Sequence, residues 1–297
     1  MNTARPTPLA QQAGFTLVEA LIVIVITGIL AAMVAVFIRA PVDGYFDSVR
    51  RAELTDTADV ALRRITRDVR LALPNSLRVA TVGNVTYIEF IMTSAGGRYR
   101  DPSDGSTSGN FLSFNDATDL SFDVHGPLPA MQPNDFVVVY NLGPGNAPAN
   151  AYADGDLCAN CNRARIAGIA GNVVTLANNP FANQSTPLPS PNGRFQVVPS
   201  GTRAVTYSCP TAATGPVQRH ANYGFFATQP TPPAGTPALL VTANAATGTG
   251  ATCAVSYAPG VGGRNGLLDI RLVVTSGLGA NAETVSLQHQ IRVDNSP

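Results

Sequence analysis

Residues 14–38 read GFTLVEALIVIVITGILAAMVAVFI, an apolar run in which Glu19 is the only charged side chain. As an α-helix, the part from Phe15 to Ile38 would be about 36 Å long, and the hydrocarbon core of a bilayer is about 30 Å thick. The sequence therefore predicts a transmembrane helix over residues 15–38.

The residues before this run have the order of a leader that is removed. Arg5 is the only charged side chain of residues 1–14, and the small residues Ala13 and Gly14 stand directly ahead of the apolar run. An ordinary secretory signal has its small-residue cleavage site after the apolar core. Cleavage after Gly14 would instead leave the apolar helix on the mature chain.

The string GFTLVE, followed by the apolar helix, resembles the N-terminal processing signal of type IV pilins and of the pseudopilins of type II secretion. The resemblance implies that a prepilin peptidase cuts between Gly14 and Phe15, that Phe15 is then N-methylated, and that Glu19 serves assembly. An ionised side chain within a bilayer costs about 3 kcal/mol or more, so it needs a partner. The implied partner is the N-terminal ammonium of a neighbouring subunit's Phe15; the alternative is a simple anchor with Glu19 at headgroup level.

The positive-inside rule disagrees with this resemblance about orientation. Arg5 precedes the apolar run, whereas Arg39, Arg50 and Arg51 follow it, which favours the opposite topology. The peptidase of the resembled family works in the cytoplasm, and four cysteines suit an oxidising compartment. We therefore expect a single-pass protein of the bacterial inner membrane, with its leader in the cytoplasm and its globular domain in the periplasm, and in the pilus after assembly.

Composition excludes several classes of function. The formal net charge is zero and 13% of residues are charged, so no overall field would attract nucleic acid. All 19 basic residues are arginines, because the chain has no lysine. A Walker A loop, a Schiff-base lysine and a Ser-Lys dyad are therefore excluded.

After the apolar run, side chains recur at helical spacing over residues 39–73. The apolar positions, at steps of three and four, are Val42, Tyr45, Phe46, Val49, Ala58, Ala61, Leu62, Ile65, Val69 and Ala72. This pattern predicts an amphipathic helix that packs on the globular domain. Pro41 and Gly44 are expected to interrupt and kink it, and Pro74 to end it.

The period becomes two after Asn75, which predicts a β-rich domain over residues 74–297 and an α+β fold overall. The dipeptide Gly83-Asn84 is a two-residue hairpin signal. Predicted strands cover 77–82, 85–91, 111–114, 120–124, 136–141, 165–169, 173–176, 195–198, 204–208, 223–227, 239–242, 254–257, 267–275 and 283–293.

Four cysteines, Cys158, Cys161, Cys209 and Cys253, make an even set for which disulfides are the first expectation. Three pairings are possible, and the one that needs least rearrangement joins Cys158 to Cys161 and Cys209 to Cys253. A zinc site lacks a second close pair of ligands. A thioredoxin-type redox role needs the C-x-x-C pair at a helix start, whereas this pair lies in an Asp/Gly/Asn loop.

Other candidate chemistry is weak, and we expect no catalytic residue, no metal and no cofactor. His125, His220 and His289 are far apart in the sequence and lack a recognised motif. A calcium loop from Asp101, Asp104 and Asn110 would depart from EF-hand spacing. The arginines of the amphipathic helix are interleaved with aspartates and lack aromatic partners, which favours a solvated helix face over nucleic-acid binding.

A second resemblance extends along the chain. The stretch from Pro41 to Val79 and the ending VSLQHQIRVDNSP look like the minor pilin of mannose-sensitive haemagglutinin (MSHA) pilus biogenesis, which is related to J-class pseudopilins. It implies a non-enzymatic subunit that helps to initiate or cap a type IV pilus. The implied partners are other minor pilins, the major pilin, the prepilin peptidase, the inner-membrane assembly platform and membrane lipid, with no nucleic acid.

Three alternatives remain open. A type II secretion pseudopilin would carry the same N-terminal signal. A tip adhesin would use the long loops to bind a surface or a glycan, and the absence of tryptophan counts slightly against it. An oxidoreductase would use the C-x-x-C pair.

Overall fold

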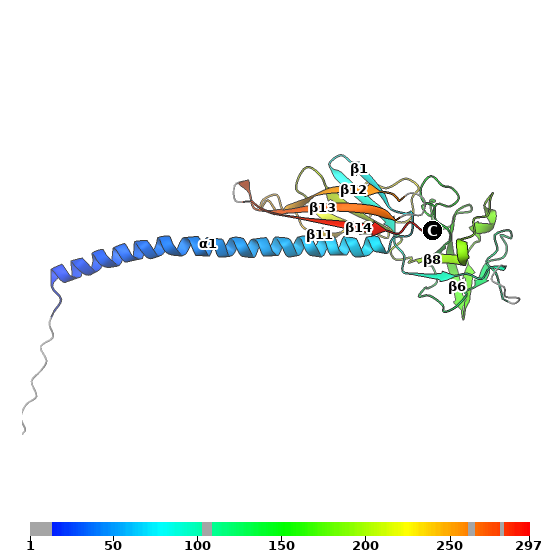
Figure 1. Ribbon diagram of the computed structural model, residues 1–297, viewed down its shortest axis with the longest axis horizontal. Coiled ribbons are helices and arrows are strands. Elements are labelled where there is room, and N and C mark those ends of the chain that lie inside the picture. Colours follow the sequence, from blue (N-terminus) through cyan, green and yellow to red (C-terminus); the bar gives the residue numbers. More distant parts are fainter. Residues whose placement is uncertain (1–13, 103–108, 261–264, 280–281) are drawn as a thin grey trace, which may run out of the picture. The chain divides into compact units, whose positions relative to one another are not determined.

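The computed structural model describes residues 14–102, 109–260, 265–279 and 282–297, without the side chains of Ala40 and Asp43 (Figure 1). The chain divides into two compact units, residues 1–50 and 51–297. One helix, α1 (Leu17–Arg70), begins in the first unit and ends in the second, and all the strands belong to the second. A long N-terminal helix followed by a sheet-rich domain confirms the predicted α+β class.

In the first unit, α1 runs through Pro41 and Gly44 without interruption, so the expected break there is wrong. Proline removes one helical hydrogen bond, and a long helix that is regular on both sides tolerates that loss. A kink at Pro41 stays a prediction.

In the second unit, one face of α1 is buried. Leu54, Ala58, Leu62, Ile65 and Val69, spaced by three and four residues, are all less than 9% exposed. The predicted amphipathic pattern is therefore confirmed for this part of the helix. On the opposite face the arginine side chains are exposed to solvent.

The helix ends at Arg70, three residues before the predicted end. Beyond it, the carbonyl of Leu71 accepts a hydrogen bond from the amide of Thr93 (2.8 Å), and the amide of Leu73 donates to the carbonyl of Ile91 (2.7 Å). Pro74 also disfavours a helical conformation for Leu73. Pairing with the end of a strand thus replaces the last helical turn.

Two antiparallel sheets share a core with α1. The five-stranded sheet has the order β1-β2-β9-β10-β11 and consists of β1 (Arg78–Val82), β2 (Val85–Ile91), β9 (Ala204–Pro210), β10 (Val217–Ala221) and β11 (Ala238–Val241). The three-stranded sheet consists of β12 (Gly250–Ala258), β13 (Gly266–Ser276) and β14 (Glu283–Val293) in sequence order. Apolar side chains of both sheets and of α1 form one continuous cluster, which we call the main core. Gly83, with φ +59°, turns β1 into β2 as predicted.

A six-stranded antiparallel sheet holds a second core. Its order is β3-β8-β5-β6-β7-β4, from β3 (Ala95–Arg98), β8 (Arg194–Val198), β5 (Phe136–Val138), β6 (Arg163–Ala170), β7 (Val173–Leu176) and β4 (Ser121–Asp123). Short 3-10 helices, η2 (Pro180–Asn183) and η3 (Pro191–Gly193), lie between β7 and β8. A third, smaller apolar cluster contains residues of the five-stranded sheet, residues of the six-stranded sheet and Phe225.

Two predicted strands are absent. Residues 111–114 are irregular because Asn110 is bound to the carbonyl and hydroxyl of Ser121. Residues 223–227 are irregular because Phe225 is packed edge-on against Phe136 and lies under the guanidinium of Arg163 at 3.6 Å. Side-chain contacts replace a strand ladder in both places. Conversely, β3 and β10 were not predicted.

A buried carboxylate ties α1 to the five-stranded sheet. Asp68 is 2% exposed and accepts hydrogen bonds from the hydroxyl of Tyr207 and from Nε of Arg219, both at 2.8 Å. Burial raises the pKa of Tyr207, so its hydroxyl stays protonated and can donate. On the other side of the main core, Thr66 of α1 contacts His289 of β14 at 3.3 Å.

Candidate functional site

The start of α1 is a capped helix terminus. The amide of Glu19 donates to Oγ1 of Thr16 (3.2 Å), and the amide of Ala20 donates to the carbonyl of Thr16 (3.1 Å). Thr16 and Glu19 have the spacing of a capping box, and a carboxylate in the first turn favours the helix dipole. Glu19 therefore has a local structural role besides the predicted role in assembly.

The peptide bond between Gly14 and Phe15 lies just before this cap. Phe15 is 83% exposed, and a Cβ added at Gly14 would meet no atom within 4 Å. Packing within the chain therefore does not require a glycine at position 14. Residues 1–13 of the predicted leader lie outside the described residues.

The apolar run after Phe15 is uncovered. Every described residue from Leu17 to Ile38 is exposed. Among the described residues, one helix is long and apolar enough to cross a membrane, and none of its most apolar window is buried within the chain. This surface must be covered by something outside the chain, because so large an apolar patch is unfavourable in water.

The structure contains two disulfides. Cys158 is bonded to Cys161 in the loop before β6, and Cys209 of β9 is bonded to Cys253 of β12, with Cα atoms 5.8 Å apart. The second bond joins the five-stranded sheet to the three-stranded sheet. Arg163, fully buried beside the first, donates to the carbonyls of Ala153 and Gly155.

The other predicted candidates do not converge. Among the described residues, no group of three or more His, Cys, Asp and Glu is placed to hold a metal ion. Asp104 lies outside the described residues, and the Asn110 amide is bound to Ser121. His220 is buried, which lowers its pKa.

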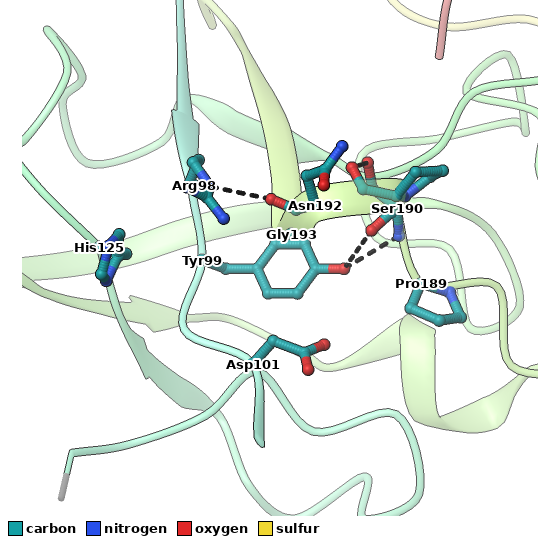
Figure 2. A pocket seen from close by; sticks show the side chains of 9 residues that line it. Arg98, Tyr99, Asp101, His125, Pro189, Ser190, Asn192 and Gly193 are labelled. Carbon is teal, nitrogen blue, oxygen red and sulfur yellow. Dashed lines mark hydrogen bonds between the residues drawn. The ribbon is translucent and has the colours of Figure 1, made fainter. Parts of the chain in front are cut away.

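A cavity of about 430 Å³ in the six-stranded sheet region was not predicted (Figure 2). Its lining residues are Arg98, Tyr99, Asp101, His125, Pro189, Ser190, Pro191, Asn192 and Gly193. They come from the end of β3, from the segment after β4, and from η3 with the residues before it. Its volume lies within the range of small-molecule sites.

Tyr99 holds one wall of this cavity. Its hydroxyl accepts a hydrogen bond from the amide of Ser190 (2.9 Å), and its own amide donates to the carbonyl of Gly193 (2.7 Å). Burial raises the pKa of Tyr99 to about 12, so the phenol is neutral at physiological pH. Figure 2 shows its ring spanning the view with the hydroxyl directed at Ser190.

Arg98 also forms a hydrogen bond to this wall of the cavity. Its Nε donates to the carbonyl of Asn192 at 2.9 Å. Asn192 and Gly193 both have φ of 62°, and a Cβ at Gly193 would come 2.9 Å from the carbonyl oxygen of Tyr99. Two successive residues in the left-handed region therefore shape the wall, which glycine permits at the second position.

Sequence reasoning missed this cavity for identifiable reasons. β3 reads AGGR, with two glycines and no alternation of apolar residues, so it gave no strand signal. A usable signal was present in Ser190-Pro191-Asn192-Gly193, a turn sequence whose Asn-Gly pair favours positive φ.

The comparisons with known proteins concern the N-terminal segment. The family model of the prokaryotic N-terminal methylation motif matches residues 9–35. This match supports a type IV pilin-like prepilin signal and membrane anchoring through the apolar helix. Neither the curated proteins nor the solved structures give a match to this chain.

Proposed function

We propose that this chain is a minor pilin or pseudopilin, a non-enzymatic subunit that helps to initiate or cap a type IV pilus of the MSHA kind. One observation carries the proposal: the methylation motif, matched over residues 9–35, includes most of an apolar helix that is exposed on all sides within the chain. A helix of this kind suits a subunit that waits in a bilayer and then packs against other subunits.

In this proposal, a prepilin peptidase cleaves between Gly14 and Phe15, and the new amino terminus of Phe15 is methylated. The exposure of Phe15 and the open space around Gly14 leave this peptide bond accessible. Glu19, in the first turn of the helix, then pairs with the ammonium of a neighbour's Phe15 inside the apolar packing, where an unpaired carboxylate would be costly.

The same proposal gives the partners and the location. The helix of residues 15–38 sits in the bacterial inner membrane, among lipid, and residues 51–297 lie in the periplasm. Other minor pilins, the major pilin and the inner-membrane assembly platform then take the subunit into the filament. The two disulfides suit the oxidising periplasm.

The mass of the mature protein tests the processing step. Intact-mass analysis of the purified protein should give a chain that begins at N-methylated Phe15. Gly14→Ala should still be processed, whereas Gly14→Leu should retain the leader because the peptidase, and not the chain, excludes a large side chain there. Retention of Met1 in assembled filaments, or a cut after Ile38, would overturn the proposal.

A further inference from the structure

We infer that the cavity beside Tyr99 is a binding site for a carboxylate-bearing sugar, such as a uronic acid unit of an acidic polysaccharide. This function is separate from filament assembly through residues 15–38, and each can fail without the other. The inference rests on the charge at one end of the cavity, on its fixed backbone and on the mixture of groups along its wall (Figure 2).

One end of the cavity carries two basic side chains. Tyr99 and Val124 form an antiparallel bridge, and the amide of His125 donates to the carbonyl of Arg98 at 2.8 Å. Arg98 and His125 are therefore opposite one another on the same face, about 5 Å apart at Cβ. Within the described part of the chain Arg98 has no carboxylate partner, since Asp123 pairs with Arg100.

An anion at this end would meet a guanidinium that is already oriented. Nε of Arg98 donates to the carbonyl of Asn192, which restrains the orientation of this solvent-exposed guanidinium. The two terminal nitrogens of the guanidinium make no hydrogen bond within the described residues. Arginine binds a carboxylate through such a pair of parallel N–H groups, and a fixed fork loses little entropy on binding.

The backbone of the wall argues against a peptide ligand. A peptide that adds to a sheet edge needs open backbone donors and acceptors. Here the amide of Ser190, the carbonyl of Asn192 and the carbonyl of Gly193 are already bound to Tyr99 and Arg98. The site therefore recognises its ligand through side chains and shape.

The remaining lining suits a sugar ring. Asn192 supplies an amide, while Pro189 and Pro191 offer apolar ring faces. A monosaccharide combines hydroxyl groups that donate and accept with an apolar ring face. A sugar with a carboxylate thus complements the polar wall, the proline faces and the basic end at once.

Saturation-transfer NMR on the full-length protein in detergent micelles tests this site. The probes are sodium glucuronate, glucose, sodium acetate and the peptide Glu-Glu-Glu, each titrated to obtain Kd. Glucuronate should bind about tenfold more tightly than glucose or acetate, because it alone has both the charge and the ring. Glu-Glu-Glu should bind more weakly than glucuronate.

Matched variants locate the binding. Arg98→Gln should weaken glucuronate binding about tenfold and leave glucose binding unchanged. His125→Gln should weaken it several-fold, and its imidazole makes no hydrogen bond within the described residues, so the wall stays intact. Arg64→Gln, the same change on the exposed face of α1, should have no effect. Thermal melts of all three variants check that the fold is kept.

Four results would overturn the inference. Equal affinities for glucuronate and glucose would remove the role of the charge, and equal affinities for glucuronate and acetate would remove the sugar. Tighter binding of Glu-Glu-Glu would point to a protein partner. Wild-type affinity in both Arg98→Gln and His125→Gln would place the ligand elsewhere.

Discussion

The two parts of α1 have opposite relations to the rest of the chain. Between Leu17 and Ile38 the helix is apolar on all sides apart from Glu19 near its start, and every described residue is exposed. Between Leu54 and Val69 it is apolar on one face only, and that face is buried in the main core. Within a few turns, the same helix thus passes from a segment whose apolar side chains contact nothing else in the chain to a segment whose apolar face packs against the sheets.

This difference shows where each part obtains its stability. The second part is stabilised by packing, by the bonds of Asp68 and by a disulfide between the sheets it contacts. Among its described residues, the first part has its backbone hydrogen bonds, its cap at Thr16 and the bonds from the Thr27 hydroxyl to the carbonyls of Val23 and Ile24, and its apolar side chains gain no packing within the chain. Substitutions in the two parts should therefore have effects in different measurements.

The largest effect is expected at Glu19. Glu19→Leu should insert in the membrane as well as the wild type, because leucine is favourable in lipid, but it should fail to enter filaments. Leaving a buried ammonium unpaired costs about 3–5 kcal/mol, which is more than 100-fold in an association constant. The measurement is the amount in sheared filaments relative to the amount in the inner membrane.

Glu53→Leu, the same substitution on an exposed position of the second part, serves as the control. It should leave the ratio near that of the wild type. If Glu19→Leu leaves the ratio of filament to membrane protein unchanged, the proposed role of Glu19 in assembly is wrong, and Glu19 only caps the helix of a simple membrane anchor.

A smaller effect is expected on removal of the disulfide that joins the two sheets. The double substitution Cys209→Ser, Cys253→Ser should lower the free energy of unfolding by about 4 kcal/mol, because the bond closes a loop over a sequence separation of 44. Cys158→Ser with Cys161→Ser should cost less than about 2 kcal/mol, since its separation is 3. Urea denaturation followed by circular dichroism measures both, and equal losses would contradict the loop-length argument.

The smallest effect is expected from a matched pair of large-to-small substitutions, one in each part of the helix. Leu62→Ala should lower the free energy of unfolding of the sheet domain by about 3 kcal/mol, because Leu62 is fully buried. Ile24→Ala should leave it unchanged within about 0.5 kcal/mol, because Ile24 is 70% exposed. A loss of domain stability with Ile24→Ala would show that the apolar part depends on contacts within the chain after all.

The parts of the fold with a strong period were predictable from sequence. The buried face of α1 from Ala58 to Val69 and the β1–β2 hairpin around Gly83 follow directly from spacing and turn chemistry. The last turn of α1 was not predictable, because its loss depends on pairing between Leu73 and Ile91, which lie far from each other in the sequence pattern. Tertiary contacts decide such ends.

The sites divide in the same way. Gly14, Phe15 and Glu19 all lie within the six-residue string GFTLVE, so a short motif was enough to nominate them. The cavity depends on Arg98, His125 and Ser190, which come from separate segments and meet only when β3 pairs with β8 and Tyr99 pairs with Val124. Asn192 and Gly193 signalled a turn, but nothing in the sequence indicated what that turn would face.

The disulfide between β9 and β12 has a mechanical consequence. The buried part of α1 contacts both sheets, through Asp68 to Tyr207 on one side and through Thr66 to His289 on the other. A tensile load applied along α1 at Arg51 would have to shear the whole packed length at once, and the Cys209–Cys253 bond would keep the two sheets from opening apart to release the helix. The buried part of α1 should therefore resist being pulled out of the sheet domain by force more than the equilibrium stability of the domain alone would suggest.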